Sequence, residues 1–585
     1  MYLLGISAYY HDSAAALLKD GTLISAMQEE RLSRVKHDNS FPIRAIQSCL
    51  DQASISMDQI SYIVFYEKPF WKFERILDSI VHSVPFSFIQ FHLAMPLWFG
   101  KRLWIKSEIQ RKLDFNKTIL FADHHSSHAA SAFYTSNFEE AAVLIMDGVG
   151  EECTTSIGHG RKNKITLLKH LKFPHSLGLL YSAFTQYCGF KVNSGEYKLM
   201  GIAALGNPKF KTMIYDRLIT VFEDGSYYLN MHYFDFTEGL QMINKRFIKL
   251  FGMDARKPES PLIPFYIDMA ASIQEVLEEI TLKLTLQTKK ITKLDKIVFA
   301  GGNFLNCKMN QRIVEAKIFE EHYFYYNPGD AGTAVGAAYL AHFDFLKNDN
   351  LLNQNQSPFL GSPLYSNQTT PSLEEKLNQY KLHFIAIDDQ LSLVANLLQE
   401  GHIVAIAQGA MEYGPRALGN RSILADPRSD KMKPILNERV KLRENFRPFA
   451  PILLDHQASR YFDLKKANYD SMMVTATAFP EAYHVMPAVI HADGTARIQL
   501  ISAKKNRFLH SLLSEFFVLT GCPALINTSF NVRGEPIAAN LEDTLHTFLY
   551  TDIDALIIEN KYLVLKSSNL DTARSLIPQK TFQND

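Results

Sequence analysis

Two histidines spaced four residues apart are the first feature of the sequence that can carry chemistry. His124 and His128 follow a short apolar run at residues 118–121. On a helix, side chains with this spacing lie on one face about 5–6 Å apart at Cβ, so the two imidazoles can ligate one metal ion. The alternative interpretation is a pair of buried histidines that are hydrogen-bonded within a core. Carboxylates in suitable loops elsewhere would favour the metal site.

Two aspartates at predicted strand ends are candidates for those carboxylates. The apolar run at residues 142–146 ends at Asp147, and the run at residues 323–326 leads to Asp330, where a helix is expected to begin. In α/β folds, ligands bind beyond the carboxyl ends of strands. Two imidazoles with two carboxylates suit iron, manganese or zinc. The predicted metal ligands are therefore His124, His128, Asp147 and Asp330.

Glycine turns that follow strands predict a nucleotide site. The predicted strand at residues 297–300 runs into Gly301 and Gly302, and Asn306 precedes the next helix. A strand, a glycine turn and a helix start form the usual phosphate-binding arrangement.

Two charged segments have less certain roles. Residues 194–201 combine Glu196 with a lysine and two glycines, which favours a ligand loop over a packing element. The dense run of charges at residues 29–38 is most simply a solvated surface. The alternative is that Lys36 in this run faces a ligand.

A pattern of buried strand, turn and hairpin occurs twice, about 140 residues apart, and predicts a duplicated α/β fold. The first copy has its strands at residues 2–7, 14–18 and 23–27, and the second has them at residues 142–146, 153–158 and 165–171. His11 lies in the polar turn of the first copy.

Composition limits the class of protein. A chain of 585 residues should contain more than one core, because single cores stop growing at about 250–300 residues. Its formal net charge is zero, so nothing global indicates binding to nucleic acid or to a membrane. Its five cysteines are scattered without a CxxC pair, which argues against a disulfide framework and against a thiolate zinc site.

The first residues have neither a basic lead nor a long apolar run, so we expect a soluble, cytoplasmic protein. Residues 81–100 are apolar and aromatic but include two prolines and two histidines. A buried or substrate-facing segment is therefore favoured over a membrane span. The wider aromatic segment from Phe70 to Trp104 either shapes a substrate pocket or is part of the core.

The second half of the chain contains a cluster of cations. Residues 410–450 have nine cationic and five acidic side chains. Arg416 and Arg421 stand among glycines and a proline, which a solvated helix face explains poorly. The planar guanidinium suits bidentate binding of phosphate or carboxylate. The cluster lacks the interleaved aromatic residues that single-stranded nucleic acid needs, so a small-anion site is favoured.

The motifs resemble those of the NodU/CmcH family of carbamoyltransferases over nearly the whole chain. In the first half these are His124-xxx-His128, Asp147-Gly, Ser194-Gly-Glu-Tyr-Lys-Leu-Met-Gly201, Gly301-Gly302 and Asn327-Pro-Gly-Asp330. In the second half they are Gly414-Pro-Arg-Ala-Leu-Gly-Asn-Arg421, Lys441-x-Arg-x-x-Phe-Arg447, Asp493-Gly-Thr-Ala-Arg497 and Asn527-Thr-Ser-Phe-Asn531. One departure is Ala410, where the family often has an arginine.

The resemblance implies a fold for each half. Residues 1–347 would form a duplicated actin/hexokinase-like (ribonuclease-H-like) domain, similar to the catalytic subunit of the tRNA threonylcarbamoylation enzymes. Residues 348–370, rich in Asn, Gln, Ser and Pro, are the predicted linker. Residues 371–570 would form an α/β domain similar to the YrdC-type synthases, and residues 571–585 a tail.

The resemblance also implies two half-reactions. The C-terminal domain would make carbamoyl-adenylate from carbamoyl phosphate and ATP, and the N-terminal domain would transfer the carbamoyl group to a hydroxyl of a small acceptor. The metal would be Fe²⁺ or another divalent ion, and His11 would be the general base, since its ordinary pKa lies near neutrality.

The implied ligands of the nucleotide or carbamoyl-adenylate are Lys36, Gly178, Glu196, Gly301, Gly302 and Asn306. Those of carbamoyl phosphate are Arg416, Arg421, Lys441, Arg447, Arg497 and Asn527. The alternatives are an ATPase or sugar kinase on the same N-terminal fold and a nucleotide-binding module without catalysis. The acceptor and the oligomeric state stay open.

Overall fold

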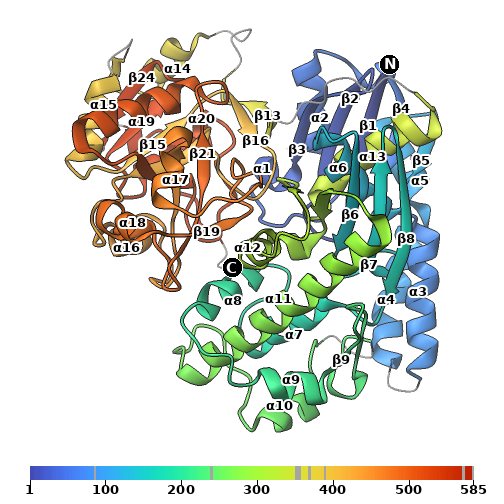
Figure 1. Ribbon diagram of the computed structural model, residues 1–585. Helices are drawn as coiled ribbons and strands as arrows, with labels where there is room; N and C mark the ends of the chain where they lie inside the picture. Colours follow the sequence, from blue (N-terminus) through green and yellow to red (C-terminus); the bar gives the residue numbers. More distant parts are fainter. Residues whose placement is uncertain are drawn as a thin grey trace. The chain divides into compact units, whose positions relative to one another are not determined.

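The computed structural model describes residues 1–585 except 85–86, 238–240, 349–356, 366–370, 388–390, 569–572 and 583–585. The chain forms two compact units, both of mixed α/β structure (Figure 1). The first unit contains residues 1–29 and 39–356, and the second contains residues 30–38 and 357–585. No helix within the described residues combines the length and the apolarity that crossing a membrane requires.

The first sheet of the N-terminal unit has the strand order β3-β2-β1-β4-β5. Its strands are β1 (Tyr2–Ser7), β2 (Ala14–Lys19), β3 (Thr22–Gln28), β4 (Ile60–Phe65) and β5 (Ile119–Phe121). Strands β1, β2 and β3 pair antiparallel, whereas β4 runs parallel to β1 and β5 runs parallel to β4. The predicted strand and hairpin at the start of the chain are confirmed.

The second sheet repeats this arrangement with the order β12-β11-β6-β7-β8. Its strands are β6 (Glu140–Met146), β7 (Cys153–Arg161), β8 (Lys164–Lys172), β11 (Lys296–Ala300) and β12 (Glu321–Phe324). Again three consecutive strands are antiparallel and two later strands add in parallel. The predicted duplication of a ribonuclease-H-like unit is therefore confirmed by topology.

Two helices occupy equivalent places in the two repeats. Helix α6 (His124–Thr135) follows β5, and α13 (Thr333–Leu340) follows β12. The helices pack against each other between the sheets, with α13 against β1 and β2 and α6 against β6 and β11 (Figure 1). Their backbones approach so closely that a Cβ added at Gly336 would lie 1.7 Å from the Ser127 carbonyl oxygen.

Other helices complete this unit. They are α2 (Ile43–Ala53), α3 (Pro69–His82), α4 (Phe88–Gly100), α5 (Ile105–Leu113), α7 (Leu177–Tyr187), α8 (Glu196–Ala203), α9 (Lys211–Arg217), α10 (Lys245–Phe251), α11 (Pro264–Thr292) and α12 (Cys307–Glu315). A two-stranded ribbon pairs β9 (Ile219–Val221) with β10 (Tyr227–Leu229).

Two predictions for the N-terminal unit are wrong in their local structure. Most of residues 194–201 is helix α8 rather than a loop, because Leu199 and Ile202 form a buried face that packs against α11. The apolar segment at residues 81–100 is largely helix α4, and most of its described side chains are exposed, which contradicts the buried alternative and leaves the substrate-facing one a prediction.

The C-terminal unit is built on an eight-stranded mixed sheet with the order β14-β24-β23-β15-β17-β22-β18-β21. Its strands are β14 (Phe384–Ala386), β15 (Val404–Ala407), β17 (Arg421–Ala425), β18 (Ala450–Leu454), β21 (Gln499–Ile501), β22 (Ala524–Ser529), β23 (Ala555–Ile558) and β24 (Tyr562–Leu565). Helix α15 (Leu391–Gln399) packs against α19 (Arg507–Thr520). Helices α14 (Leu373–Gln379) and α20 (Leu541–Leu549) also belong to this unit.

Part of the predicted linker is ordered structure. Strand β13 (Phe359–Pro363) pairs antiparallel with β16 (Ala410–Glu412). Residues 349–356 and 366–370 of the predicted linker lie outside the described residues. The division of the chain at residues 347 and 371 stays a prediction.

The charged run at residues 29–38 is not a solvated surface. It begins with the short helix α1 (Glu29–Ser33), in which Glu30 and Arg31 are buried. The Arg31 guanidinium donates to the Gly414 carbonyl at 2.7 Å, and Arg34 donates to the Glu535 carboxylate at 2.8 Å. Buried charges are tolerated when they are paired and hydrogen-bonded, which explains why this charged segment packs into the C-terminal unit.

Candidate metal centre and anion site

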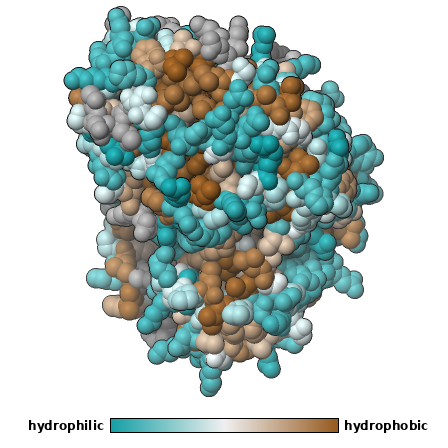
Figure 2. Space-filling model, turned by 90° about the vertical axis from the view of Figure 1, so that its left-hand side faces the viewer, coloured by the Kyte–Doolittle hydropathy of each residue, from teal (hydrophilic) through white to brown (hydrophobic). Residues whose placement is uncertain are grey.

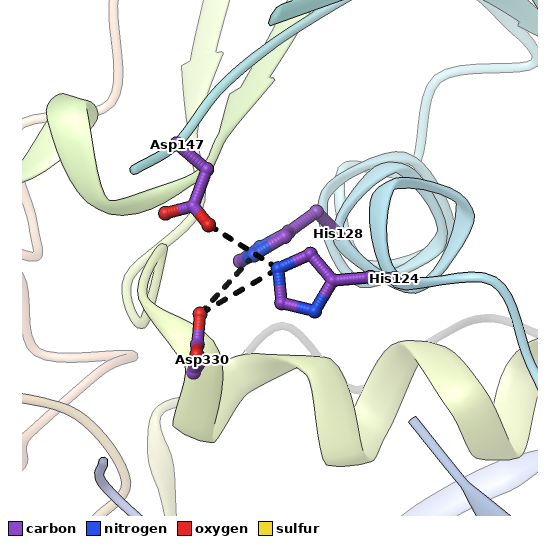
Figure 3. A group of neighbouring side chains, drawn as sticks. All are labelled: His124, His128, Asp147 and Asp330. Atoms are coloured by element: carbon purple, nitrogen blue, oxygen red, sulfur yellow. Dashed lines mark hydrogen bonds and ion pairs between the residues drawn. The ribbon is translucent and has the colours of Figure 1, made fainter. Parts of the chain in front are cut away.

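The four predicted metal ligands converge on one point (Figure 3). His124 and His128 project from α6, Asp147 follows β6, and Asp330 begins the 3-10 turn that leads into α13. One donor atom from each side chain lies within 4.8 Å of the other three. The His124 Nε2 atom is 3.2 Å from Asp147 Oδ2, and the His128 Nε2 atom is 3.5 Å from Asp330 Oδ1.

Local structure fixes these side chains. The Asp123 carboxylate caps α6 by accepting the Ser126 backbone N–H at 2.9 Å, so the helix begins where it presents His124 and His128 on one face. The Gly302 backbone N–H donates to Asp147 Oδ1 at 3.1 Å and holds this carboxylate in place. The ligands are therefore positioned by a helix cap and a glycine turn as well as by their own elements.

The donor atoms fit a divalent cation. Metal bonds of about 2.0–2.2 Å put neighbouring donor atoms about 3–3.6 Å apart, close to the distances found here. His128 Nε2 and both Asp330 carboxylate oxygens are buried and have no hydrogen-bond partner among the described residues. Because a buried polar group without a partner is costly, a cation bound to these atoms would remove that cost. This donor set does not select iron over manganese or zinc.

The charges of the cluster stabilise one another. Burial alone would lower the pKa of His124, but Asp147 and Asp330 raise it to about 9. Burial would raise the pKa of Asp147, but the neighbouring His124 and His128 hold it well below its usual range. The site therefore favours ionised carboxylates, the form in which they bind a cation.

His11 lies beside the cluster, in the turn between β1 and β2. Its Nδ1 atom is 2.9 Å from Asp12 Oδ2, its Nε2 atom is 3.9 Å from Asp330 Oδ2, and its side chain is 25% exposed. Burial would lower the pKa of His11, but Asp330, Asp12 and Asp147 raise it to about 9. A cation bound to the same carboxylates would offset their charge and bring the pKa of His11 back toward neutrality.

The predicted glycines gather around Asp147. A Cβ added at Gly178 would lie 3.1 Å from the Asp147 carbonyl oxygen, and one added at Gly301 would lie 2.2 Å from the Met146 carbonyl oxygen. Gly301 also has a φ of +101°, which favours glycine. The structure thus brings Gly178, Gly301 and Gly302 together at the end of β6.

The other predicted nucleotide ligands have structural partners or lie elsewhere. The Glu196 carboxylate accepts the Ser182 hydroxyl at 2.7 Å. The Asn306 side chain caps α12 and pairs with the Gln274 amide. Lys36 belongs to the C-terminal unit rather than to the unit that holds the glycines.

Lys441 is the centre of the cation cluster in the C-terminal unit. Its buried ammonium donates to the Ser529 and Asn531 carbonyls, both at 2.6 Å. Burial lowers its pKa well below the usual range, and the positive charges of Arg443, Arg447 and Lys36 lower it further. A cluster that lowers the pKa of its own lysine stabilises an anion placed among these cations.

The predicted anion ligands differ in accessibility. Arg421 is completely buried, and its guanidinium donates to backbone carbonyls, including Gln408 at 2.6 Å and Asn420 at 2.9 Å. It therefore has a framework role, and we leave it out of the proposed anion site. The partly exposed arginines are Arg416, Arg447 and Arg497. Asn527 donates to Gln499 at 2.7 Å, while its buried Oδ1 atom has no partner among the described residues.

Sequence reasoning missed two residues that contact the metal cluster. The buried Glu151 carboxylate accepts the His124 backbone N–H at 3.0 Å and the Lys68 backbone N–H at 2.8 Å. The Tyr66 ring meets the His124 ring edge to face, with centroids 5.4 Å apart. The only signal for Glu151 was its place in the glycine turn after a strand, and nothing in the sequence singled out Tyr66.

Comparisons with known proteins agree with the resemblance seen in the motifs. Residues 2–339 match the family described as "Carbamoyltransferase N-terminus", and residues 395–566 match "Carbamoyltransferase C-terminus". An uncharacterized protein of Synechocystis sp. is 42% identical over 614 aligned positions that cover 100% of both chains. Nodulation protein NolNO of Sinorhizobium fredii is 33% identical over 574 positions, covering 96% of this chain and 80% of the relative.

Among solved structures, HypF of T. kodakarensis aligns with 60% of this chain and 50% of its own, at 13% identity and a TM-score of 0.33. The two family matches cover most of the chain, in the order of its two predicted domains. The chain therefore belongs to the NodU-type carbamoyltransferase family, and the protein is a transferase.

Proposed function

We propose that this carbamoyltransferase works in two steps in its two units. In the C-terminal unit, water cleaves carbamoyl phosphate to carbamate and phosphate, and the carbamate displaces pyrophosphate from ATP to give carbamoyl-adenylate. The N-terminal unit transfers the carbamoyl group from the adenylate to a hydroxyl of a small acceptor and releases AMP. The observation that carries the transfer step is the set of buried donor atoms of His128 and Asp330 that have ion-pair contacts but no hydrogen-bond partner among the described residues.

The first step rests on the cation cluster. Three arginines are partly exposed, so a solute can reach them: Arg416, Arg447 and Arg497. A guanidinium can donate two parallel hydrogen bonds to two oxygens of one phosphate. Lys441 is held in place by hydrogen bonds to Asn531. The positive charges of Arg447 and Lys36 act on its ammonium group. These residues support binding of a small phosphorylated anion rather than of a nucleic acid.

The second step rests on the metal centre and His11. His124, His128, Asp147 and Asp330 would hold a divalent cation, for which we propose Fe²⁺. When bound, this cation would polarise the carbamoyl carbonyl as a Lewis acid. The neutral His11 imidazole would take the proton of the attacking hydroxyl, and Asp12 orients the ring through its hydrogen bond to Nδ1.

The two steps can be separated by replacing Arg447. Removing one arginine from an anion clamp leaves the anion underpaired and costs about 2–5 kcal/mol. Arg447→Ala should therefore lose carbamoyl-phosphate-dependent release of pyrophosphate by several orders of magnitude while the protein stays folded. Transfer from supplied carbamoyl-adenylate to a true acceptor should be largely retained.

The matched control is Arg439→Ala, which removes an exposed arginine paired with Asp552 and should change neither step. Normal pyrophosphate release by Arg447→Ala would contradict the anion site. Loss of transfer from supplied adenylate would contradict the division between the units. A kinase or ATPase would convert ATP to ADP without consuming carbamoyl phosphate.

A further inference from the structure

Helix α4 is apolar on nearly all sides and yet lies at the surface. It has no charged side chain, and among its described side chains only Met95 is buried. Phe88 is 72% exposed, Ile89 66% and Leu97 57%. A helix of this kind is normally buried in a core or in a membrane. Among the described residues, α3 and the 3-10 turn after α4 (Arg102–Trp104) pack against part of the helix. Its exposed side chains are available for a partner.

The composition around α4 is that of an interface with lipid. All three tryptophans of the chain, Trp71, Trp98 and Trp104, lie in α3, in α4 and in the turn after α4. Lys101 and Lys106, at the end of α4 and the start of α5, are exposed. Trp is enriched where apolar chains meet polar headgroups, and exposed lysines bind the phosphates of anionic lipids.

We propose that α4 and the turn into α5, residues 88–106, bind the surface of an anionic lipid bilayer. The apolar residues of α4 would enter the boundary between headgroups and acyl chains, and Lys101 and Lys106 would contact lipid phosphates. The protein would lie on the bilayer without crossing it, which agrees with the lack of a membrane-spanning helix among the described residues. This revises the expectation that no membrane is involved.

The contact is confined to α4 and the turn because α3 differs in charge. The exposed side of α3 includes Phe70 and Trp71 but also Glu74 and Asp78, which anionic lipids would repel. The two helices are fixed to each other by the Phe73 ring, whose centroid is 5.5 Å from those of Trp98 and Phe99. The pair can therefore present α4 outward as a stable unit.

A second copy of the chain fits this surface less well. A second copy paired through α4 would offer Lys101 and Lys106 no carboxylate from that helix, because α4 has no acidic side chain, whereas anionic lipid complements them. Isolated apolar patches alone would not support a lipid contact, because they are common on protein surfaces. On the face drawn in Figure 2, such patches are separated by hydrophilic residues. Helix α4 differs because its exposed residues follow one another along a whole helix.

Vesicle flotation combined with tryptophan fluorescence tests the proposal on the full-length protein. The protein is mixed with vesicles of phosphatidylcholine alone or with about one-third phosphatidylglycerol, in low salt and in 0.5 M NaCl. We expect binding to the anionic vesicles that is at least tenfold tighter than to the neutral ones and that weakens in high salt. Because all three tryptophans lie near the contact, their emission should shift to shorter wavelength on binding.

Variants locate the contact. Phe88→Asp combined with Leu97→Asp should weaken vesicle binding at least tenfold, and so should Lys101→Glu combined with Lys106→Glu. The matched controls are Val518→Asp, at a residue of α19 that is 81% exposed, and Lys162→Glu, in the exposed turn between β7 and β8. Both controls should bind like the wild type, and circular dichroism should show every variant folded.

Three outcomes would overturn the proposal. One is equal binding of the wild type and the Phe88/Leu97 variant. Another is a wild-type protein that binds no vesicle. In that case light scattering would show either a monomer or a dimer, and dissociation of a dimer by the Phe88/Leu97 variant would identify α4 as a contact between two copies. The third is equal, salt-independent binding to neutral and anionic vesicles, which would remove the role of the lysines.

Discussion

The two repeats of the N-terminal unit place different chemistry at equivalent positions. The turn after β1 carries His11, whereas the turn after β6, its counterpart, carries Asp147. The helix after β5 presents His124 and His128, whereas the segment between β12 and α13 presents Asp330. One backbone arrangement thus supplies imidazoles from the first repeat and carboxylates from the second.

This difference explains why the site needs both repeats. The first repeat alone would offer only neutral or positive ligands, and the second alone two carboxylates that repel each other. Together they offer two imidazoles and two carboxylates, a set that offsets much of the charge of a divalent cation.

The largest expected effect comes from removing the carboxylate contributed by the second repeat. Asp330→Ala leaves the two histidines without their shared partner, so affinity for Fe²⁺, Mn²⁺ or Zn²⁺ should fall at least a thousandfold, or about 4 kcal/mol. Calorimetric titration and metal content by mass spectrometry would show this. Asp344→Ala, at an exposed residue just after α13, is the matched control. Unchanged metal affinity in Asp330→Ala would contradict the shared site.

The two equivalent turns should respond differently to the same kind of substitution. His11→Asn should lower carbamoyl transfer by a factor of about 10²–10⁴, because a general base is lost, but should leave metal affinity within a few fold. Asp147→Asn should weaken metal binding itself. Transfer rates with supplied carbamoyl-adenylate, measured beside metal affinity, separate the two roles. A His11→Asn protein with full transfer activity would refute the role of the base.

The pairing of imidazole with carboxylate should make the metal-free protein sensitive to alkali. The pKa of His124 is raised to about 9 in the folded state, so its contribution is fully present below its unfolded value near 6.5 and is lost as the pH rises toward 9. The loss is about 3 kcal/mol. Urea unfolding of metal-free protein between pH 6 and 9.5 should show it, and His124→Gln should make the profile shallower while leaving the contribution of His11, whose pKa is also raised to about 9. A wild-type profile that is already flat would contradict the pairing.

The close contact between α6 and α13 should make a substitution at Gly336 destabilising. This effect should be the smallest of those predicted. Gly336→Ala puts a methyl group against the Ser127 carbonyl on α6 and should lower the free energy of unfolding by about 1–3 kcal/mol. Gly329→Ala is the matched control, since its added Cβ meets no atom within 4 Å. Thermal unfolding compares them. Equal melting temperatures for Gly336→Ala and Gly329→Ala would contradict a tight contact between α6 and α13.

The strands and the convergence of His124, His128, Asp147 and Asp330 could be predicted because each leaves a local pattern. Buried strands such as β1 and β6 are short apolar runs. The i,i+4 spacing of His124 and His128 puts both side chains on one face of a helix. Asp147 and Asp330 could be anticipated because strand ends in α/β folds collect ligands. These patterns require no knowledge of distant partners.

The misplaced residues depend on partners far away in the sequence. Arg421 had the type and the setting of an anion ligand, but the Ala539 carbonyl and other backbone oxygens surround its guanidinium. Glu151 was overlooked because its contact with the backbone N–H of His124, at the start of α6, forms only when the two segments come together in the fold. Exposure of α4 could not be inferred, since an apolar helix is usually covered. Charge or hydropathy alone cannot distinguish these cases.

The segment at residues 30–38 affects the order in which the two units fold during synthesis. Its Arg34 pairs with Glu535, a residue 501 positions later in the chain. At ribosomal rates of about 5–20 residues per second, Arg34 would emerge about 25–100 s before its partner is synthesised. During that interval the first unit can fold, while Arg34 in the segment at residues 30–38 has not yet paired with the Glu535 carboxylate. The C-terminal unit therefore completes its structure only when the last tenth of the chain closes on a segment made at the very beginning.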